Sequence, residues 1–431
     1  MLKRTITFIA FLIVCNTITA QNLHNFFIED TYQRSYFNPA LNNDGYISIA
    51  SGIGIDASTT GPNLNDFLIK KPEGGYIISP SNSIDKMKDR NDIYGMVSVN
   101  TFDASIDLFL VRVSVGHAWK ANGWFNYSKD LANFLVNGNG SYVGQTLNLG
   151  PQIEYFNYNE VYLGIQKNLG TLSLGAKIKR LSGVESIFTN QSKLDLTTSD
   201  DIYQLTVDAD YEINSSQAFN YVDINNFSLD VENYSFDNFM TNNTGWAFDI
   251  GASLSIGKIE MSLSIIDIGS IDWDKDVINY RTNSTVFLDG IDLSDLIINN
   301  QEISIADSLE TILKFEESNN VFTTKLPTQI FLGGIVDISD KFSIGALFHS
   351  IGSEDRRSNA ISLNVTTKIN GFISAGILYA IKDSNVANFG IFGALKIGPV
   401  KGFLSTDNIF GIISTTTSKE SNIRAGLSLK I

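Results

Sequence analysis

The sequence predicts an all-β fold, a transmembrane antiparallel β-barrel of about 14 strands with long extracellular loops. Apolar and polar residues alternate with a period of two over many segments of about ten residues, which is the length of a tilted membrane strand. Connections between these segments are of two sharply different lengths. After the N-terminal segment, the chain contains no apolar run of about 18 residues, so transmembrane helices are excluded. A barrel is then the remaining way to satisfy every backbone group in lipid.

Alternation is clearest in the last segment of the chain. Apolar or small residues occupy every second position from Ile423 to Ile431, and Arg424, Ser428 and Lys430 lie between them. In a barrel, the first set faces lipid and the second faces the lumen. A half-buried strand of a soluble protein gives the same pattern, so the prediction depends on repetition. The other segments with this pattern start near Ile47, Ile93, Phe109, Val161, Leu172, Trp246, Ile259, Thr328, Phe342, Ala360, Phe372, Asn388 and Val400.

The connections predict which end of the barrel faces outward. Short polar breaks occur at 168–170, 340–341, 370–371 and 398–399, and Asn370-Gly371 is a strong signal for a two-residue hairpin. Four other connections are long, and they cover roughly 57–91, 118–150, 183–245 and 268–327. Membrane barrels have short periplasmic turns and long extracellular loops. We therefore expect the long connections outside the cell, and the short breaks in the periplasm.

Two of the long connections carry short helical patterns. Lys129 to Val136 places Leu131, Phe134 and Leu135 at helical spacing. Ile305 to Phe315 places apolar residues on one helical face. Such helices can plug the lumen, cap the mouth or pack against the barrel rim, and the sequence leaves these alternatives open.

We expect two regions along the chain, a signal peptide over residues 1–20 and an outer-membrane β-barrel with its loops over residues 21–431. Lys3 and Arg4 supply the charged start, Phe8 to Cys15 form an apolar run too short to cross a bilayer, and Ala20 offers a cleavage site. Lipid attachment at Cys15 is the alternative. The bulky residues before Cys15 disfavour it, because a small residue is expected there.

Charge and cysteine content exclude several classes of function. Loss of Lys3 and Arg4 reduces 31 basic residues to 29, against 46 acidic residues, which gives a mature net charge of −17. Such a charge disfavours nucleic acid as a partner. Cys15 is the only cysteine and lies in the expected signal peptide. The mature chain is therefore expected to have neither a disulfide scaffold nor thiol chemistry.

No catalytic, cofactor-binding or metal-ligating residues are predicted, and the chain is not expected to be an enzyme or to hold a cofactor. His24, His117 and His349 have no metal-ligand spacing, and the last two are interpreted as interfacial or rim residues. Asp267 and three aspartates around Trp273 form an acidic cluster, but the glycine and distal glutamate of an EF-hand are missing. The cluster is interpreted as solvated loop charge.

Several stretches resemble a family of outer-membrane barrels of Bacteroidota that is catalogued as a domain of unknown function. The resemblance runs from about residue 36 to the end of the chain, and it is carried by the order of its motifs. These are Asn38-Pro39-Ala40, Trp246 to Ala252, Ser264 to Trp273, Leu326-Pro327-Thr328 and Ser405 to Asn408. Pro39 has a fixed φ and biases Asn38 away from helical geometry, so this motif is expected to end an N-terminal arm.

The Asn38-Pro39-Ala40 start also resembles barrels of the PorP/SprF and PorV kinds, which are associated with type IX secretion and gliding motility. PorV belongs with the FadL-like hydrophobic-transporter barrels. The resemblance implies an outer-membrane location and an accessory role beside a secretion machine, without catalytic residues. The partners expected from it are outer-membrane lipid and envelope or secretion-machinery proteins.

Three functions remain open on the sequence alone. The first is a binding or accessory barrel in surface protein export or cell-surface organisation, and the second is a FadL-like transporter of a hydrophobic small molecule. The third is a purely structural barrel. The content of the lumen distinguishes them, because an open polar channel or an apolar pocket favours transport, whereas a lumen filled by loop side chains favours a partner-binding role.

Overall fold

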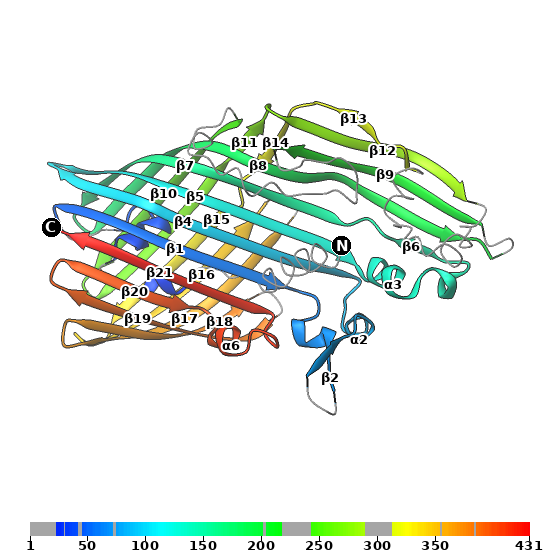
Figure 1. The fold of residues 1–431 in the computed structure, drawn as a ribbon. Helices are drawn as coiled ribbons and strands as arrows, with labels where there is room; N and C mark the ends of the chain where they lie inside the picture. The colour runs from blue at the N-terminus through cyan, green and yellow to red at the C-terminus, as the bar shows by residue number, and fades with distance from the viewer. Residues whose placement is uncertain are drawn as a thin grey trace.

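The computed structural model describes residues 23–29, 31–41, 45–71, 75–200, 204–217, 243–288, 313–353, 356–382 and 385–431. Within these residues, fourteen antiparallel strands close into a barrel, as the sequence predicts (Figure 1). The last strand pairs with the first, from Ser48 opposite Lys430 to Ser58 opposite Glu420. In order round the barrel the strands are β1 (Ile47–Thr59), β4 (Arg90–Leu108), β5 (Val111–Ser128), β7 (Gln152–Leu169), β8 (Leu172–Thr198), β10 (Asn243–Ile256), β11 (Ile259–Trp273), β15 (Thr328–Asp337), β16 (Phe342–Gly352), β17 (Arg357–Ile369), β18 (Ile373–Lys382), β19 (Asn385–Ile397), β20 (Val400–Thr406) and β21 (Glu420–Lys430).

The outer surface of the barrel is apolar and its inner surface is polar. In β21, Leu427 points outward and is 60% exposed, whereas the next residue, Ser428, points into the lumen and is 2% exposed. In β10, the side chains of Phe248 and Ile250 are exposed on either side of the buried Asp249. A barrel dissolved in water would bury its apolar side chains inside. The reverse arrangement seen here is that of a barrel embedded in lipid.

The two ends of the barrel differ. At one end, here called the turn end, short turns join neighbouring strands, and the C-terminus lies beside them (Figure 1). The turn between β17 and β18 confirms the predicted hairpin, although it has three residues because Phe372 joins Asn370 and Gly371. Asn370 and Gly371 both have positive φ, which these two residue types adopt more readily than others. The opposite end, with the long connections, is here called the loop end.

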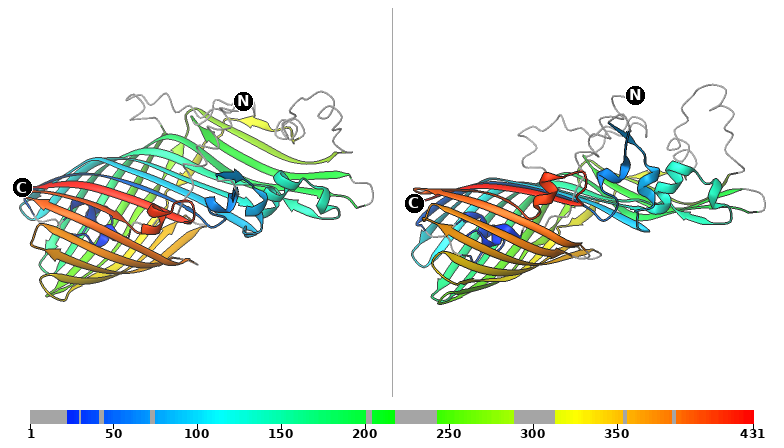
Figure 2. Two further views of the ribbon diagram at one scale, coloured as in Figure 1. Left: turned by 60° about the horizontal axis from the view of Figure 1, so that its bottom comes forward. Right: turned by 90° about the horizontal axis from the view of Figure 1, so that it is seen from below.

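At the loop end, strands continue past the barrel as a projecting sheet (Figures 1 and 2). The outer half of β8 pairs with β6 (Thr146–Asn148) and β9 (Leu205–Ser216), and β9 pairs with β12 (Val277–Leu288). The short strands β13 (Glu316–Ser318) and β14 (Phe322–Lys325) pair with β12 and β11. The prediction of loops over 118–150, 183–245 and 268–327 was therefore partly wrong. In β9 apolar and polar residues do alternate, but the apolar residues Leu205, Val207 and Ala209 pack in a buried cluster of the projecting sheet and not against lipid.

The connections at the loop end contain short helices. The predicted helix at 129–136 is confirmed as α3 (Lys129–Asn137), which Ser128 caps by accepting a hydrogen bond of 2.9 Å from the Leu131 amide. The β1–β4 connection contains a small hairpin, and α6 follows β20. The remaining elements are η3 (Leu64–Phe67), β2 (Leu68–Lys70), β3 (Tyr76–Ile78), α2 (Ser81–Ile84), η4 (Gly140–Tyr142) and α6 (Ile409–Ile413).

Two short helices, η1 (His24–Phe27) and η2 (Tyr32–Tyr36), lie inside the barrel and appear as blue turns behind its front wall (Figures 1 and 2). Residues 1–22, with the expected signal peptide, lie outside the described residues, as does most of the helical pattern at 305–315. In the part of the chain that the structure describes, no helix is long and apolar enough to cross a membrane.

Candidate functional site

The lumen is partly filled by the chain's own N-terminal region. Residues 23–29 and 31–41, here called the lumen segment, are almost completely buried, and Phe26, Phe27 and Tyr32 are each at most 2% exposed. Small residues on the barrel wall make room for these rings. A Cβ on Gly345 would lie 2.4 Å from the Phe27 ring, and one on Gly333 would lie 2.9 Å from the Phe26 ring. The glycines on the inner face of these strands therefore accommodate an internal segment.

The Asn38-Pro39-Ala40 motif docks the end of the lumen segment on the wall. The Asn38 side-chain amide donates to the carbonyl oxygens of Ala252 in β10, at 3.0 Å, and of Leu263 in β11, at 3.3 Å. Its side-chain oxygen accepts from the Ala40 amide at 2.8 Å, which closes a turn around Pro39. A Cβ on Gly251 would meet the Asn38 oxygen at 2.0 Å. The motif is therefore a docking turn, as well as the end of the N-terminal arm.

Charged groups of the barrel bind the start and middle of the lumen segment. The Asp407 carboxylate accepts hydrogen bonds of 2.9 Å from the backbone amides of both Leu23 and His24. Arg34 donates to the Phe26 carbonyl at 3.0 Å and forms an ion pair with Glu260 on β11. Bonds between charged and neutral groups are stronger than those between neutral groups. The lumen segment is therefore fixed at several points.

A tyrosine cluster joins η2 to the neighbouring wall. The hydroxyl of Tyr32 lies 3.0 Å from that of Tyr162, and Tyr162 donates to Asp103 at 2.6 Å. Tyr36 donates to the other oxygen of the same carboxylate. Lys177 donates to the Ser35 carbonyl at 2.8 Å, and its ammonium lies 4.5 Å from the centroid of the Tyr162 ring. This cluster ties η2 to β4, β7 and β8.

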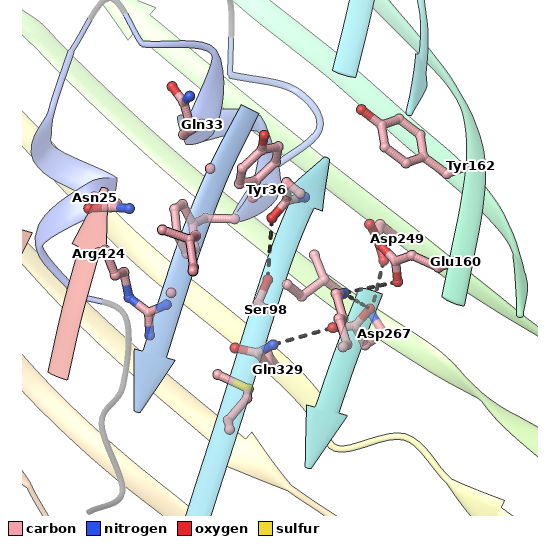
Figure 3. Close-up of a pocket in the computed structure, with 18 of the residues that line it drawn as sticks. Asn25, Gln33, Tyr36, Ser98, Glu160, Tyr162, Asp249, Asp267, Gln329 and Arg424 are labelled. Atoms are coloured by element: carbon pink, nitrogen blue, oxygen red, sulfur yellow. Dashed lines mark hydrogen bonds and ion pairs between the residues drawn. The ribbon is translucent and has the colours of Figure 1, made fainter. Parts of the chain in front are cut away.

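A cavity adjoins the lumen segment, and Figure 3 shows it in close-up. Its volume is about 950 Å³, including space that is open to solvent. Most of its wall residues lie farther from the turn end than the glycines that contact Phe26 and Phe27, so the cavity extends toward the loop end. It is lined by Asn25, Gln33, Tyr36, Phe37, Gly52, Ile53, Gly54, Met96, Ser98, Asn100, Lys120, Asn122, Tyr158, Glu160, Tyr162, Lys177, Lys179, Asp249, Ile266, Asp267, Pro327, Gln329, Phe403, Arg424 and Ala425.

Five charged side chains form a connected cluster on one wall of this cavity. Lys120 lies 2.9 Å from Glu160 and 3.5 Å from Asp267. Lys179 lies 2.7 Å from Asp249 and 2.5 Å from Asp267. Each lysine thus contacts two carboxylates. Burial of an unpaired charge is costly, and each of these charged side chains avoids that cost by pairing with an opposite charge. The cluster therefore places two lysine and three acidic side chains, joined by ion pairs, on this wall of the cavity.

Asp267 reaches this cluster because of an irregularity in β11. The β10–β11 register shifts between Phe248 and Ile250, and Asp267 has a φ of +59°, which a non-glycine residue rarely adopts. The Asp267 amide donates to Asp249 at 2.9 Å, and Gln329 donates to the Asp267 carboxylate at 3.3 Å. Strained backbone of this kind often occurs at functional sites. The bulge turns Asp267 inward, into the cluster.

Two other polar atoms at the cavity, one on the lumen segment and one on β21, are not satisfied within the described residues. The Gln33 amide donates to the carbonyls of Ser51 and Leu427, both at 2.9 Å, but its side-chain oxygen accepts no hydrogen bond. Arg424 pairs with Asp56, and its Nε donates to no acceptor. Buried polar groups normally have partners. One acceptor and one donor at the cavity are therefore left for water or a ligand.

Arg356 crosses the barrel at the loop end of the cavity. Its guanidinium lies 3.4 Å from the centroid of the Trp124 ring on β5 and pairs with Glu154 on β7. Arg356 lies in the connection between β16 and β17. Going round the barrel, four strands separate β16 from β7, and six separate β17 from β5, so the contact spans the mouth. Trp124 stands two residues beyond Asn122, which lines the cavity. Removal from water lowers the pKa of Arg356 to about 10, so it stays charged at neutral pH.

The structure changes two interpretations of single residues. His349 was predicted at the rim, but it is fully buried in the lumen, where it stacks on Phe331 at 4.1 Å and lies 3.1 Å from Gln329. Asp267 does not share a solvated cluster with the aspartates around Trp273, because the bulge turns it into the lumen. In the described residues, no group of three or more histidine, cysteine and acidic side chains can hold a metal. The absence of catalytic and cofactor-binding residues stays a prediction.

Replacement of the docking asparagine tests the attachment of the lumen segment. Asn38→Ala removes two hydrogen bonds to barrel carbonyls, and loss of bonds at a buried site costs about 1–3 kcal/mol. We expect a lower midpoint for the heat-induced gel shift that reports barrel unfolding. Asn137→Ala, on the exposed end of α3, is the control and is expected to leave the midpoint unchanged. Equal midpoints for the two variants would contradict the docking role.

Several solved barrels have a similar outline to this chain. The toluene transporter TbuX of Ralstonia pickettii is 9% identical, with 93% of each chain covered and a TM-score of 0.45. The toluene transporter TodX of Pseudomonas putida is 8% identical, with 96% of this chain and 94% of that chain covered and a TM-score of 0.42. A FadL homologue of Pseudomonas aeruginosa is 10% identical, with 93% of each chain covered and a TM-score of 0.40. At these values the likeness does not bear on function. No curated protein matches the sequence.

A family match covers most of the chain. Residues 39–407 match a family described as "Family of unknown function (DUF5723)". The matched stretch begins in the Asn38-Pro39-Ala40 turn and ends at Asp407, the carboxylate that binds the start of the lumen segment. The chain therefore belongs to the DUF5723 family of unknown function.

Proposed function

We propose that the protein is an outer-membrane channel that admits a small molecule from outside the cell, and that its lumen segment keeps the channel closed to ions and to solutes that do not fit the cavity. One observation carries the proposal: a closed barrel contains its own N-terminal segment next to a cavity lined by both apolar and polar side chains. Barrels of this kind place short turns in the periplasm and long loops outside. The turn end is then periplasmic, and the cavity opens toward the exterior.

The lining of the cavity favours an amphipathic ligand. Phe37, Met96 and Phe403 offer apolar surface, while Gln33 and Arg424 hold a free acceptor and a free donor. Small-molecule sites in proteins combine apolar walls with a few polar groups that orient the ligand. We therefore propose a molecule with an apolar body and one or two polar groups. This is the FadL-like transport function considered from the sequence, with polar groups added to the hydrophobic ligand.

The Arg356 contact supplies a test of this function. Arg356→Ala removes the side chain that spans the mouth, so entry to the cavity is expected to become severalfold faster. The measurement is influx of benzyl alcohol, octanoate and sucrose into proteoliposomes that contain the full chain or the variant. Arg357→Ala is the neighbouring control, because Arg357 bonds Ser350 on its own hairpin and does not cross the mouth.

The outcomes of this experiment are distinct. The proposal predicts saturable influx of benzyl alcohol or octanoate above that of protein-free liposomes, slow influx of sucrose, and acceleration by Arg356→Ala alone. If none of the three probes enters faster than in protein-free liposomes through either protein, the channel function is wrong. Influx of sucrose as fast as that of octanoate would retain a channel but contradict the amphipathic ligand.

The projecting sheet favours a second function, which is binding of another envelope protein. Its face toward α3 is apolar and covered, whereas Lys193, Asp208 and Arg281 lie on an exposed face. Such a platform suits an accessory role in surface protein export, as in PorP/SprF-type barrels of Bacteroidota. A photocrosslinker at Asp208 in native membranes is expected to capture a second envelope protein, and one at the lipid-facing Leu363 is not. Capture at both positions or at neither would contradict this function.

A further inference from the structure

One strand of the barrel is too short to cross the apolar layer. β20 has seven residues, whereas its neighbours β19 and β21 have 13 and 11. At about 3.3 Å per residue and a tilt of about 40°, seven residues rise only about 18 Å along the barrel axis. The apolar band of such barrels is about 25 Å tall and requires strands of about 9–11 residues. Above β20, the wall therefore ends inside the thickness of the bilayer.

The helix α6 begins where β20 ends, and it is held firmly against β21 (Figure 1). Asn408 caps it by accepting from the Phe410 amide at 3.2 Å, and donates to the Glu420 carbonyl at 2.8 Å. Gly411 makes the close approach possible, since a Cβ there would lie 2.1 Å from the Glu420 carbonyl oxygen. Ser421 donates to the Gly411 carbonyl. The rotation of α6 about its own axis is therefore fixed.

This rotation places three large apolar side chains on the outside of the molecule. Phe410, Ile412 and Ile413 are 55%, 42% and 75% exposed. The Phe410 ring lies 6.2 Å from Phe389 on β19, at a right angle, and Phe389 lies 5.1 Å from Tyr379 on β18. Phe389 is itself one of the outward-facing residues of the barrel. The apolar face of α6 is thus continuous with the lipid-facing surface.

We propose that α6 is embedded in the outer leaflet of the membrane, with Phe410, Ile412 and Ile413 against lipid acyl chains. The helix completes the apolar band at the one position where a strand is too short to do so. Water is a poor neighbour for three adjacent apolar side chains, and lipid already covers Phe389 beside them. The aromatic pair of Phe389 and Phe410, with Tyr379 next to it, fits the aromatic girdle that such barrels place at the interface.

A single spin label measures the surroundings of α6. Because Cys15 lies in the expected signal peptide, an introduced cysteine is the one thiol of the mature chain. Ile413→Cys carries a nitroxide in α6, Leu404→Cys is the lipid-facing control on β20, and Thr415→Cys is the control in the loop after α6. Collisions of the label with oxygen, which concentrates in lipid, and with a water-soluble nickel chelate are compared in bilayer nanodiscs.

The proposal predicts an oxygen-to-nickel collision ratio at Ile413→Cys close to that of Leu404→Cys and severalfold above that of Thr415→Cys. A ratio equal to that of Thr415→Cys would overturn it. Spin–spin broadening at Ile413→Cys in liposomes, which vanishes in nanodiscs with one protein each, would mean that a second copy covers α6. That outcome would also overturn the proposal. The gel shift on heating confirms that each labelled variant is folded.

Discussion

Deletion of the lumen segment, residues 23–41, is expected to turn the barrel into an open pore, with single-channel conductance at least about tenfold above that of the full chain. Barrels of eight strands are filled by their own side chains, and those of 16–18 strands hold an aqueous channel. A barrel of 14 strands lies between these sizes, so an internal segment decides whether ions pass. Once Phe26, Phe27 and Tyr32 are absent, water can fill the space that they occupy. The measurement is current across a planar bilayer.

A point substitution tests the same prediction if the deletion variant does not fold. Lys177→Ala removes the bond to the Ser35 carbonyl and the contact with the Tyr162 ring, which loosens η2 without removing it. Brief openings are expected in place of a permanently open pore. Lys193→Ala, at an exposed ion pair on the projecting sheet, is the matched control and is expected to leave the channel closed. A folded deletion variant that conducts no better than the full chain would show that the lumen segment does not close the barrel.

Leu363→Arg is expected to destabilise the barrel by about 2–4 kcal/mol, which is the cost of arginine at a lipid-facing position near the midplane. Leu363 is the seventh of the 13 residues of β17, and its side chain is 57% exposed on the outer surface. That loss is a large part of a typical domain stability of about 5–15 kcal/mol. Folding yield into lipid vesicles, read from the gel shift on heating, is expected to fall sharply.

The control for Leu363→Arg is an arginine inside the lumen. Ser98→Arg places the same side chain beside the cavity, where polar groups and open space can accommodate it, so its folding yield is expected to stay near that of the native chain. Ser428→Arg is a poorer control, because the lumen segment occupies the interior near β21 and Gln33 bonds the Leu427 carbonyl. Equal yields for Leu363→Arg and Ser98→Arg would contradict the assignment of the outer face to lipid.

The barrel itself was predictable because its strands obey a strict rule of alternation. In β10, Phe248, Asp249 and Ile250 take the faces that their polarity requires, and the same logic holds along β21. The rule gave no strand beyond the bilayer, although Leu205, Val207 and Ala209 of β9 alternate with polar residues there. Their apolar face packs in the core of the projecting sheet and not against lipid. The rule also failed at Asp267, because a bulge of one residue exchanges the two faces of a strand, and the sequence gives no sign of its position.

The lumen segment was not predictable by the same reasoning. Its helices, η1 and η2, span only four and five residues, too few to establish a helical period. The density of aromatic residues between Phe26 and Phe37 was the available signal, since a solvated N-terminal arm has no reason to carry it. Asn38 was identified only as the end of an arm. Its docking role depends on carbonyls more than 200 positions away in the chain.

The bonds from Asp407 to Leu23 and His24 also constrain the order in which the protein assembles. They join residues that are 384 and 383 positions apart, and the seam between β1 and β21 joins the two ends of the barrel in the same way. Contacts of such long range form late, because the entropy of closing the loop between them is lost before they stabilise anything. Leu23 and His24 can therefore form these bonds only after Asp407, which precedes the last strand, is in place. Until then the chain is an open sheet, and the inward-facing Lys179 and Asp249 are accessible to water. When β21 pairs with β1, the barrel closes around the lumen segment.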